Sequence, residues 1–176
     1  RTGRHPGPTR PARSSDVSRQ SAPDPHGLTH EARLFVCAVQ FLTRIPTPQL
    51  NGFDPSWITQ SARYFPLVGQ IVGAISALAL FGAAQIWTPW IAALLAISLG
   101  VVITGGFHED GLADTADGLG GLTRARRLEI MKDSRLGSYG ALALGLTLAL
   151  RVAALAALTA LSPALAALAL FAAHGL

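Results

Sequence analysis

The sequence predicts an all-α membrane protein, a polytopic helical bundle preceded by a disordered N-terminal tail. Half of its 176 residues are hydrophobic and only 14% are charged, whereas soluble domains carry about 25% charged residues. From Tyr64 to Phe107 there is no Asp, Glu, Lys or Arg. One helix over that stretch would reach about 66 Å, roughly twice the hydrocarbon core of a bilayer. We therefore expect two spans there, joined as a hairpin.

The N-terminal tail, residues 1–28, contains five prolines and five arginines and almost nothing that forms a core. Such a composition favours disorder; a transit peptide or an RNA-binding arm is the alternative. Residues 29–176 form the predicted membrane helical domain. Its first apolar segment, Glu31–Ile45, is shorter than the roughly 20 residues of a span, so it indicates a buried or interfacial helix.

We place the first two spans near 67–87 and 90–106, with Thr88 and Pro89 at the turn. A third span is expected over 140–161, and a partial fourth over 163–176. A charged loop, 107–139, separates the second span from the third. The chain does not begin with Met and stops inside an apolar run, which predicts a C-terminally truncated polypeptide.

Lysine and arginine counts give the expected orientation. The arginine-rich tail and the basic run after residue 123 are separated by two spans, so both lie on one side of the membrane, and the positive-inside rule makes that side cytoplasmic. The turn at Thr88–Pro89 has no basic residue. We expect a multi-pass protein of the inner cell membrane with membrane lipid around it, and no nucleic acid as partner.

The segment Gly105–Gly121, GGFHEDGLADTADGLGG, carries the acidic residues that indicate function. If it is helical, Asp110, Asp114 and Asp117 stand at i, i+4 and i+7 on one stripe. Like charges at this spacing repel, so the stripe predicts a cation, and oxygen ligands favour Mg²⁺, Mn²⁺ or Ca²⁺. Two glycines inside the segment weaken a helix, which leaves a loop or a broken helix as the alternative.

The neighbours of this stripe offer acid–base groups. Glu109 and Asp110 are candidate bases for an attacking hydroxyl. His108 is a further candidate base, or a hydrogen-bonding group for a substrate, although an ideal helix turns it nearly opposite the stripe.

Basic residues and a glycine-bracketed turn follow the stripe. The candidate substrate-binding residues are Arg124, Arg127, Lys132, Arg135, Gly137 and Ser138. The turn before the third span can hold an anion with its backbone N–H groups. Arg151 lies in the middle of that span, where charge is costly, so we expect it to pair with an acidic group or a substrate phosphate; snorkelling to the interface is the alternative. Metal-binding carboxylates with phosphate-binding arginines predict phosphoryl transfer.

These motifs closely resemble the cobalamin synthase family, adenosylcobinamide-GDP ribazoletransferase. The resemblance lies in GGFHEDGLADTADGLGG and LEIMKDSRLGSYGALAL, with FLTRIPTP and YFPLVGQIVGAI upstream. It covers about residues 31 to 160, with the motifs in the same order and at the same spacing. Together they are specific, whereas the three aspartates alone would be a weak signal.

The resemblance implies a membrane enzyme of late vitamin B12 synthesis. It would join α-ribazole, or its 5′-phosphate, to adenosylcobinamide-GDP with Mg²⁺, giving GMP and adenosylcobalamin or its phosphate. Asp110, Asp114 and Asp117 would then be the metal ligands and Glu109 a ligand or base, while Lys132 and Arg135 would contact the pyrophosphate. Family members are longer at the C-terminus, so the resemblance supplies only the first, metal-binding half of a site. Association into a homo-oligomer is left open.

Two other functions fit parts of the pattern. Membrane phosphotransferases of the CDP-alcohol type also set several aspartates on a helix above the bilayer, but their arginine spacing after the first Asp-Gly is not matched here. A transporter would use the acidic stripe as an ion site and Arg151 as a gate. Transporters place such charges near the membrane midplane within repeats, and no repeat is visible in this sequence.

Overall fold

The computed structural model describes residues 28–175, and every regular element in that range is a helix. The all-α class is therefore confirmed. The predicted disordered tail, 1–28, lies outside the described residues except for Leu28, where the first helix begins. In chain order the helices are α1 (Leu28–Leu42), α2 (Ser56–Ser61), η1 (Ala62–Tyr64), α3 (Phe65–Ala83), α4 (Pro89–Thr104), α5 (Phe107–Gly118), α6 (Arg124–Ile130), α7 (Ser138–Leu161) and α8 (Pro163–Ala173).

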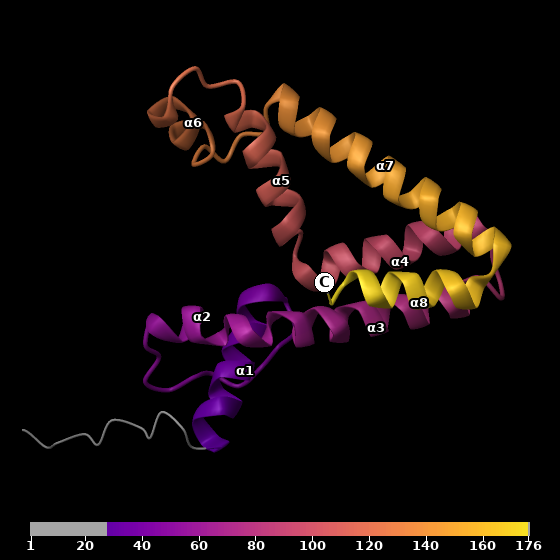
Figure 1. The fold of residues 1–176 in the computed structure, drawn as a ribbon, viewed down its shortest axis with the longest axis horizontal. Coiled ribbons are helices and arrows are strands. Elements are labelled where there is room, and N and C mark those ends of the chain that lie inside the picture. The colour runs from indigo at the N-terminus through magenta and orange to yellow at the C-terminus, as the bar shows by residue number, and fades with distance from the viewer. Residues whose placement is uncertain (1–27, 176) are drawn as a thin grey trace, which may run out of the picture.

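Helices α3, α4, α7 and α8 form the apolar bundle. α3 lies beside both α4 and α8, and α7 meets them at the end where the α3–α4 and α7–α8 turns lie (Figure 1). Their shared core contains the fully buried residues Leu80, Ala92, Ala93, Ala96 and Ala166. Small side chains let helix backbones approach closely, which is how helices associate where lipid surrounds them.

The turn between α3 and α4 is where the sequence predicts it. α3 ends at Ala83, and Thr88 has extended backbone angles (φ −63°, ψ 154°) directly before Pro89 begins α4. Proline is favoured at the start of a helix, because the N–H that it lacks would have no partner there. Trp87 and Trp90 flank the turn and expose 48% and 60% of their surface, as expected of rings that anchor a hairpin at a membrane interface.

Within residues 28–175, two helices are long and apolar enough to cross a membrane alone. They are the continuous helix from Ser56 to Ala83, with 28 residues, and α7, with 24. The predicted spans 67–87 and 140–161 correspond to them. α4 has 16 residues, or about 24 Å, and reaches the length of a span only together with α5, across a bend of 87°. α4 therefore lies where the span 90–106 was predicted but is shorter than a full straight span. α8 has 11 residues, a length that suits the partial span predicted over 163–176.

α1 and α2 pack beside the first turns of α3. Leu34 and Trp57 are buried together, and the ring of Phe41 stacks on that of Phe65 at a centroid distance of 5.6 Å. α1 has 15 residues, which matches the short buried or interfacial helix predicted over Glu31–Ile45.

The charged segment 107–139 is mostly helical. α5 and α6 occupy it, and both lie at the end of the bundle opposite the α3–α4 turn (Figure 1). α6 begins with a side-chain cap, since Thr123 Oγ1 accepts a hydrogen bond from the N–H of Arg126 at 3.3 Å.

Ala96→Leu is expected to destabilise the bundle. Ala96 is fully buried in the core, and added methylenes in a packed core cost about 1–3 kcal/mol. Thermal unfolding in detergent micelles measures the effect. Ser98→Leu, at an exposed position of the same helix, is the matched control and should leave the midpoint unchanged. Equal midpoints for both variants would contradict this packing.

Candidate functional site

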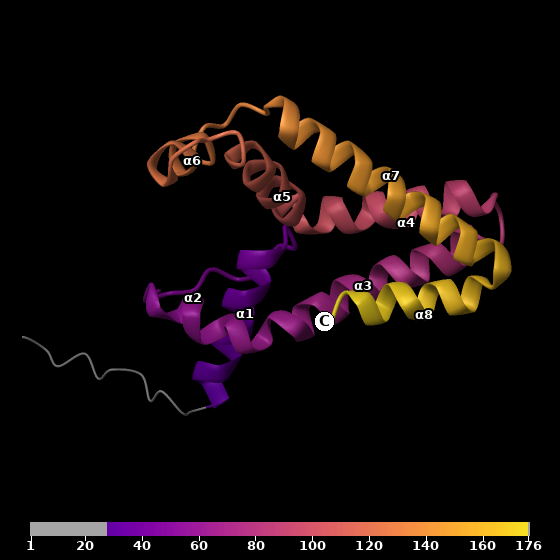
Figure 2. The same cartoon turned by 45° about the horizontal axis from the view of Figure 1, so that its top comes forward.

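A sharp bend positions the acidic helix. Gly105 and Gly106, between α4 and α5, both have left-handed backbone angles, with φ of 67° and 73°. L-residues with a side chain rarely adopt such angles, so two successive glycines permit this turn. α5 therefore leaves α4 at 87° and runs toward the N-terminal end of α7 (Figure 2). This bend places the acidic residues of α5 away from the axis of the apolar bundle.

The acidic segment is a helix, as the stripe argument requires. α5 is continuous from Phe107 to Gly118 despite the two glycines that weaken it. Its three aspartates accordingly stand at i, i+4 and i+7. Glu109 and Asp110 lie in the first turn, where negative charge interacts favourably with the helix dipole.

Asp110 and Asp114 differ from the third aspartate in their surroundings. Asp110 is exposed and Asp114 is half-buried. Among the described residues, neither side chain accepts a hydrogen bond or forms an ion pair. Two carboxylates one helical turn apart, without a partner for their charge, can share a cation.

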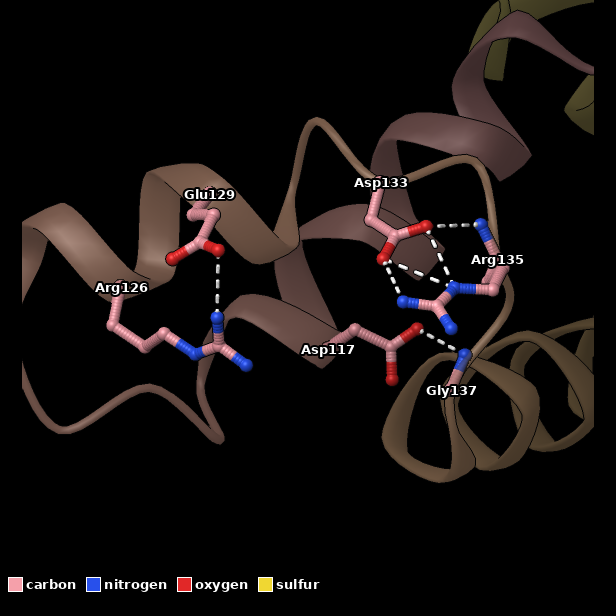
Figure 3. A network of polar contacts seen from close by, with 6 residues as sticks. All are labelled: Asp117, Arg126, Glu129, Asp133, Arg135 and Gly137. Atoms are coloured by element: carbon pink, nitrogen blue, oxygen red, sulfur yellow. Dashed lines mark hydrogen bonds and ion pairs between the residues drawn. The ribbon is translucent and has the colours of Figure 1, made fainter.

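Asp117 binds the start of α7. Its Oδ2 accepts a hydrogen bond from the N–H of Gly137 at 2.8 Å (Figure 3). Its Oδ1 accepts one from the N–H of Gly140, also at 2.8 Å. A Cβ at either glycine would stand 2.4 Å from a carboxylate oxygen of Asp117, so a side chain at either position would displace this carboxylate. The turn predicted to hold an anion thus holds one from the protein itself. Roles for Asp117 in binding metal, and for Gly137 and Ser138 in binding substrate, stay predictions.

Glu109 forms a second tie between α5 and α7. Its Oε1 accepts a hydrogen bond from Nη1 of Arg151 at 2.9 Å, and the Glu109 side chain is only 15% exposed. The expectation that Arg151 pairs with an acidic group is confirmed. Glu109 Oε2 is buried and accepts no hydrogen bond from any described residue. Arg151 therefore holds Glu109 in place through Oε1, and the lone pairs of Oε2 are available to accept a hydrogen bond or a proton.

Two pockets meet at Glu109. The first has a volume of about 740 Å³ and mostly apolar walls from α3, α4, α7 and α8, with His108, Arg151 and His174 among its polar groups. The second has a volume of about 830 Å³ and lies between the end of α1, the α4–α5 bend and the start of α7. Arg44 and Asp110 line it together with Glu109.

The predicted basic residues lie on α6 and the connection after it. Arg135 donates to Asp133 through Nη2 at 2.6 Å and also through Nε (Figure 3). Arg127 donates from Nε to the carbonyl of Gly121 at 2.8 Å. Arg124 and Lys132 are exposed. The structure places no described ion pair between this basic group and the aspartates of α5, so its role in binding substrate stays a prediction.

Arg44 is a site residue that sequence reasoning did not select. It marks the end of an apolar helix in the sequence, and only the fold brings it to the bend before α5. The one signal available was a basic residue at the edge of an apolar segment, which is equally typical of a membrane flank.

No three His, Cys, Asp or Glu side chains within residues 28–175 come together as a ready-made metal site. Mg²⁺ does not require one, since it is usually bound by one or two carboxylates with waters and substrate phosphates. Asp110 and Asp114 fit that donor set.

Comparison with known proteins identifies relatives. The sequence model of a family described as cobalamin-5-phosphate synthase matches residues 34–176. A protein of Leptothrix cholodnii named adenosylcobinamide-GDP ribazoletransferase is 55% identical over 148 residues, 84% of this chain and 56% of that protein. Proteins of the same name from Shewanella frigidimarina and Shewanella pealeana are each 51% identical, over 83% and 82% of this chain. The chain spans 56% of the length of these relatives. No solved structure matches it.

Asp117→Ala is expected to loosen the start of α7, because loss of a helix cap costs about 1–2 kcal/mol. Hydrogen exchange at the amides of Gly137 and Gly140 measures it directly, and both should lose protection. Gly140→Ala should also lower the protection of these amides, because its Cβ would displace the carboxylate of Asp117. Asp114→Ala, on the same helix and without a described partner, is the control. Unchanged protection in the Asp117 variant would refute the cap.

The pKa of Asp133 is expected to be low. Hydrogen bonds from the Arg135 side chain, and then from its backbone N–H, lower this pKa from 3.8 to about 2. Because the pKa in the folded protein is depressed, the interaction is complete above pH 3.8 and is lost as the pH falls through about 2. A ¹³C NMR titration of the carboxyl group checks the value. In Arg135→Gln the pKa should return toward 3.8; an unchanged pKa would contradict this cause.

Proposed function

Because the chain belongs to the cobalamin-5-phosphate synthase family, we propose that it transfers adenosylcobinamide phosphate from adenosylcobinamide-GDP to α-ribazole, or to its 5′-phosphate, and releases GMP. One observation carries the proposal. Asp110 and Asp114 stand one turn apart on a helix fixed to α7, without a partner among the described residues. Carboxylates free to bind a cation, next to a pocket with a guanidinium, suit a metal-bound phosphate.

The reaction is phosphoryl transfer to an alcohol. The hydroxyl oxygen of α-ribazole forms a bond to the phosphorus on the cobinamide side, and the bond from that phosphorus to the oxygen of GMP breaks. GMP leaves with the electron pair, while the hydroxyl proton passes to a base. We assign this proton to Oε2 of Glu109, since Arg151 holds Oε1 and no described residue donates to Oε2. His108, which lines the first pocket, is the alternative base.

Asp110 and Asp114 would hold Mg²⁺ in this proposal. When bound, the metal would neutralise charge on the phosphate oxygens and assist the departure of GMP. Asp117 remains a predicted third ligand, although both its oxygens already accept backbone hydrogen bonds. Its clearest contribution is to keep α5, and with it the other two carboxylates, against α7.

We place the site on the cytoplasmic side of the cell membrane. α5 and α6 lie at one end of the bundle, and the α3–α4 and α7–α8 turns lie at the other (Figure 1). Lys and Arg are concentrated in and around α6, whereas neither of those two turns contains any. This distribution supports the positive-inside orientation.

The proposal is tested with membranes that contain the protein. They are incubated with adenosylcobinamide-GDP, α-ribazole and Mg²⁺, and the released GMP is measured. GMP should appear together with adenosylcobalamin, and omission of α-ribazole should abolish both, which separates transfer from hydrolysis. Folded protein that releases no GMP would refute the proposed function.

Asp114→Asn is expected to lower the rate of GMP release by about 100-fold or more, because loss of metal-based charge stabilisation raises the barrier by several kcal/mol. Asp110→Asn should act similarly. Glu129→Gln removes an exposed acid on α6 that pairs with Arg126, and it should retain activity. Initial rates at matched amounts of inserted protein provide the comparison. Wild-type rates in both aspartate variants would exclude their role as ligands.

A further inference from the structure

Arg44 is fixed at the bend before the acidic helix. It follows α1 by two residues, and its N–H donates to the carbonyl of Ile103 in the last turn of α4 at 2.7 Å. Phe41 packs edge-on against Phe107, the first residue of α5, at a centroid distance of 5.3 Å. The end of α1 is thus held against both helices that meet at the bend.

The side chain of Arg44 lies over Gly105. A Cβ on Gly105 would stand 2.4 Å from Nε of Arg44 and 3.0 Å from its Cγ. A Cβ on Gly106, whose φ is similarly positive, would meet nothing within 4 Å. Gly105 therefore has a second role besides the backbone turn, because its missing side chain leaves room for this arginine.

Arg44 lines the second pocket with Glu109 and Asp110, and it is exposed. Among residues 28–175 its guanidinium has no ion pair or hydrogen bond. The ion pairs described for other arginines are those of Arg63, Arg126, Arg135 and Arg151. A guanidinium offers five donors in a planar fork that matches phosphate oxygens. Arg44 has these donors available in the pocket that also contains a proposed metal-binding carboxylate.

We propose that Arg44 binds a phosphate oxygen of the nucleotide substrate in this second pocket, opposite the carboxylates of α5. The inference rests on the proposed function, since that function supplies the pyrophosphate. A lipid headgroup offers the same phosphate chemistry at this end of the bundle, so the experiment separates the two sources.

Arg44→Gln tests substrate binding, with Arg33→Gln as its matched control. Arg33 lies within α1 and, like Arg44, is an exposed arginine without a described ion pair. In Arg44→Gln, KM for adenosylcobinamide-GDP should rise about 10-fold or more, because the lost contact is charge-assisted, and Arg44→Lys should recover part of it. Equilibrium dialysis of adenosylcobinamide-GDP without α-ribazole should show the same loss of affinity without turnover.

The two glycines supply an independent test. Gly105→Ala and Gly106→Ala introduce similar backbone strain, but only the first displaces Arg44. Gly105→Ala should weaken substrate binding more than Gly106→Ala. In an Arg44→Ala background the two substitutions should have equal effects. A difference that persists in that background would overturn the role of Gly105.

The outcomes also separate the two proposals. If GMP is released but Arg44→Gln behaves as Arg33→Gln, the assignment of Arg44 is wrong and the proposed function stands. If Arg44 binds a lipid headgroup instead, Arg44→Gln would leave KM unchanged and would change how activity depends on the phosphatidylglycerol content of nanodiscs. That result would also overturn the assignment of Arg44 to the substrate phosphate. If GMP is not released but binding of adenosylcobinamide-GDP still falls in Arg44→Gln, the proposed reaction fails and the phosphate site remains. No binding by the wild-type protein would overturn the site.

Discussion

The two successive left-handed glycines between α4 and α5 are the constraint on which the site depends. With φ of 67° and 73°, Gly105 and Gly106 end an apolar helix and turn the chain through 87°, which a residue with a Cβ would do only under strain. Without this turn α5 would continue along the bundle and its acids would enter the apolar layer, where ionised groups are costly. The bend brings them to the end of the bundle, and it also leaves the space that Arg44 occupies.

Two contacts with α7 then fix the direction of α5. Arg151 pairs with Glu109 near the start of α5, and Asp117 binds the N-terminal backbone of α7 near its end. Because the two contacts lie at opposite ends of α5, together they favour one arrangement of the two helices. Between them, Asp110 and Asp114 are the acids of α5 that have no described partner. Glu109 and Asp117 thus hold α5 against α7, whereas the side chains of Asp110 and Asp114 are available to bind a cation.

The helices and the aspartate stripe could be predicted from the sequence, whereas the partners of the site residues could not, because they depend on tertiary contacts. The absence of charge from Tyr64 to Phe107 was enough for a hairpin, and the spacing of the aspartates was enough for one helical stripe. The partners of Asp117 were not predictable, because Gly137 and Gly140 lie 20 and 23 residues away and their glycine-rich turn suggested an anion from outside. Arg44 was missed for the same reason. The bend of 87° after α4 was not predicted, because the sequence signals there only the end of an apolar segment, whereas the direction of the next helix depends on the backbone angles of Gly105 and Gly106.

We expect the divalent cation to depend on Asp110 and Asp114, since both oxygens of Asp117 already accept hydrogen bonds from the backbone of α7. Electron paramagnetic resonance of Mn²⁺ titrated into the purified protein in nanodiscs tests it directly, because free and bound Mn²⁺ give different signals. We expect the wild-type protein and Glu129→Gln to bind Mn²⁺ alike, and the double variant Asp110→Asn with Asp114→Asn to lose that binding while its helices stay folded. Undiminished Mn²⁺ binding by the double variant would show that Asp110 and Asp114 are not the ligands.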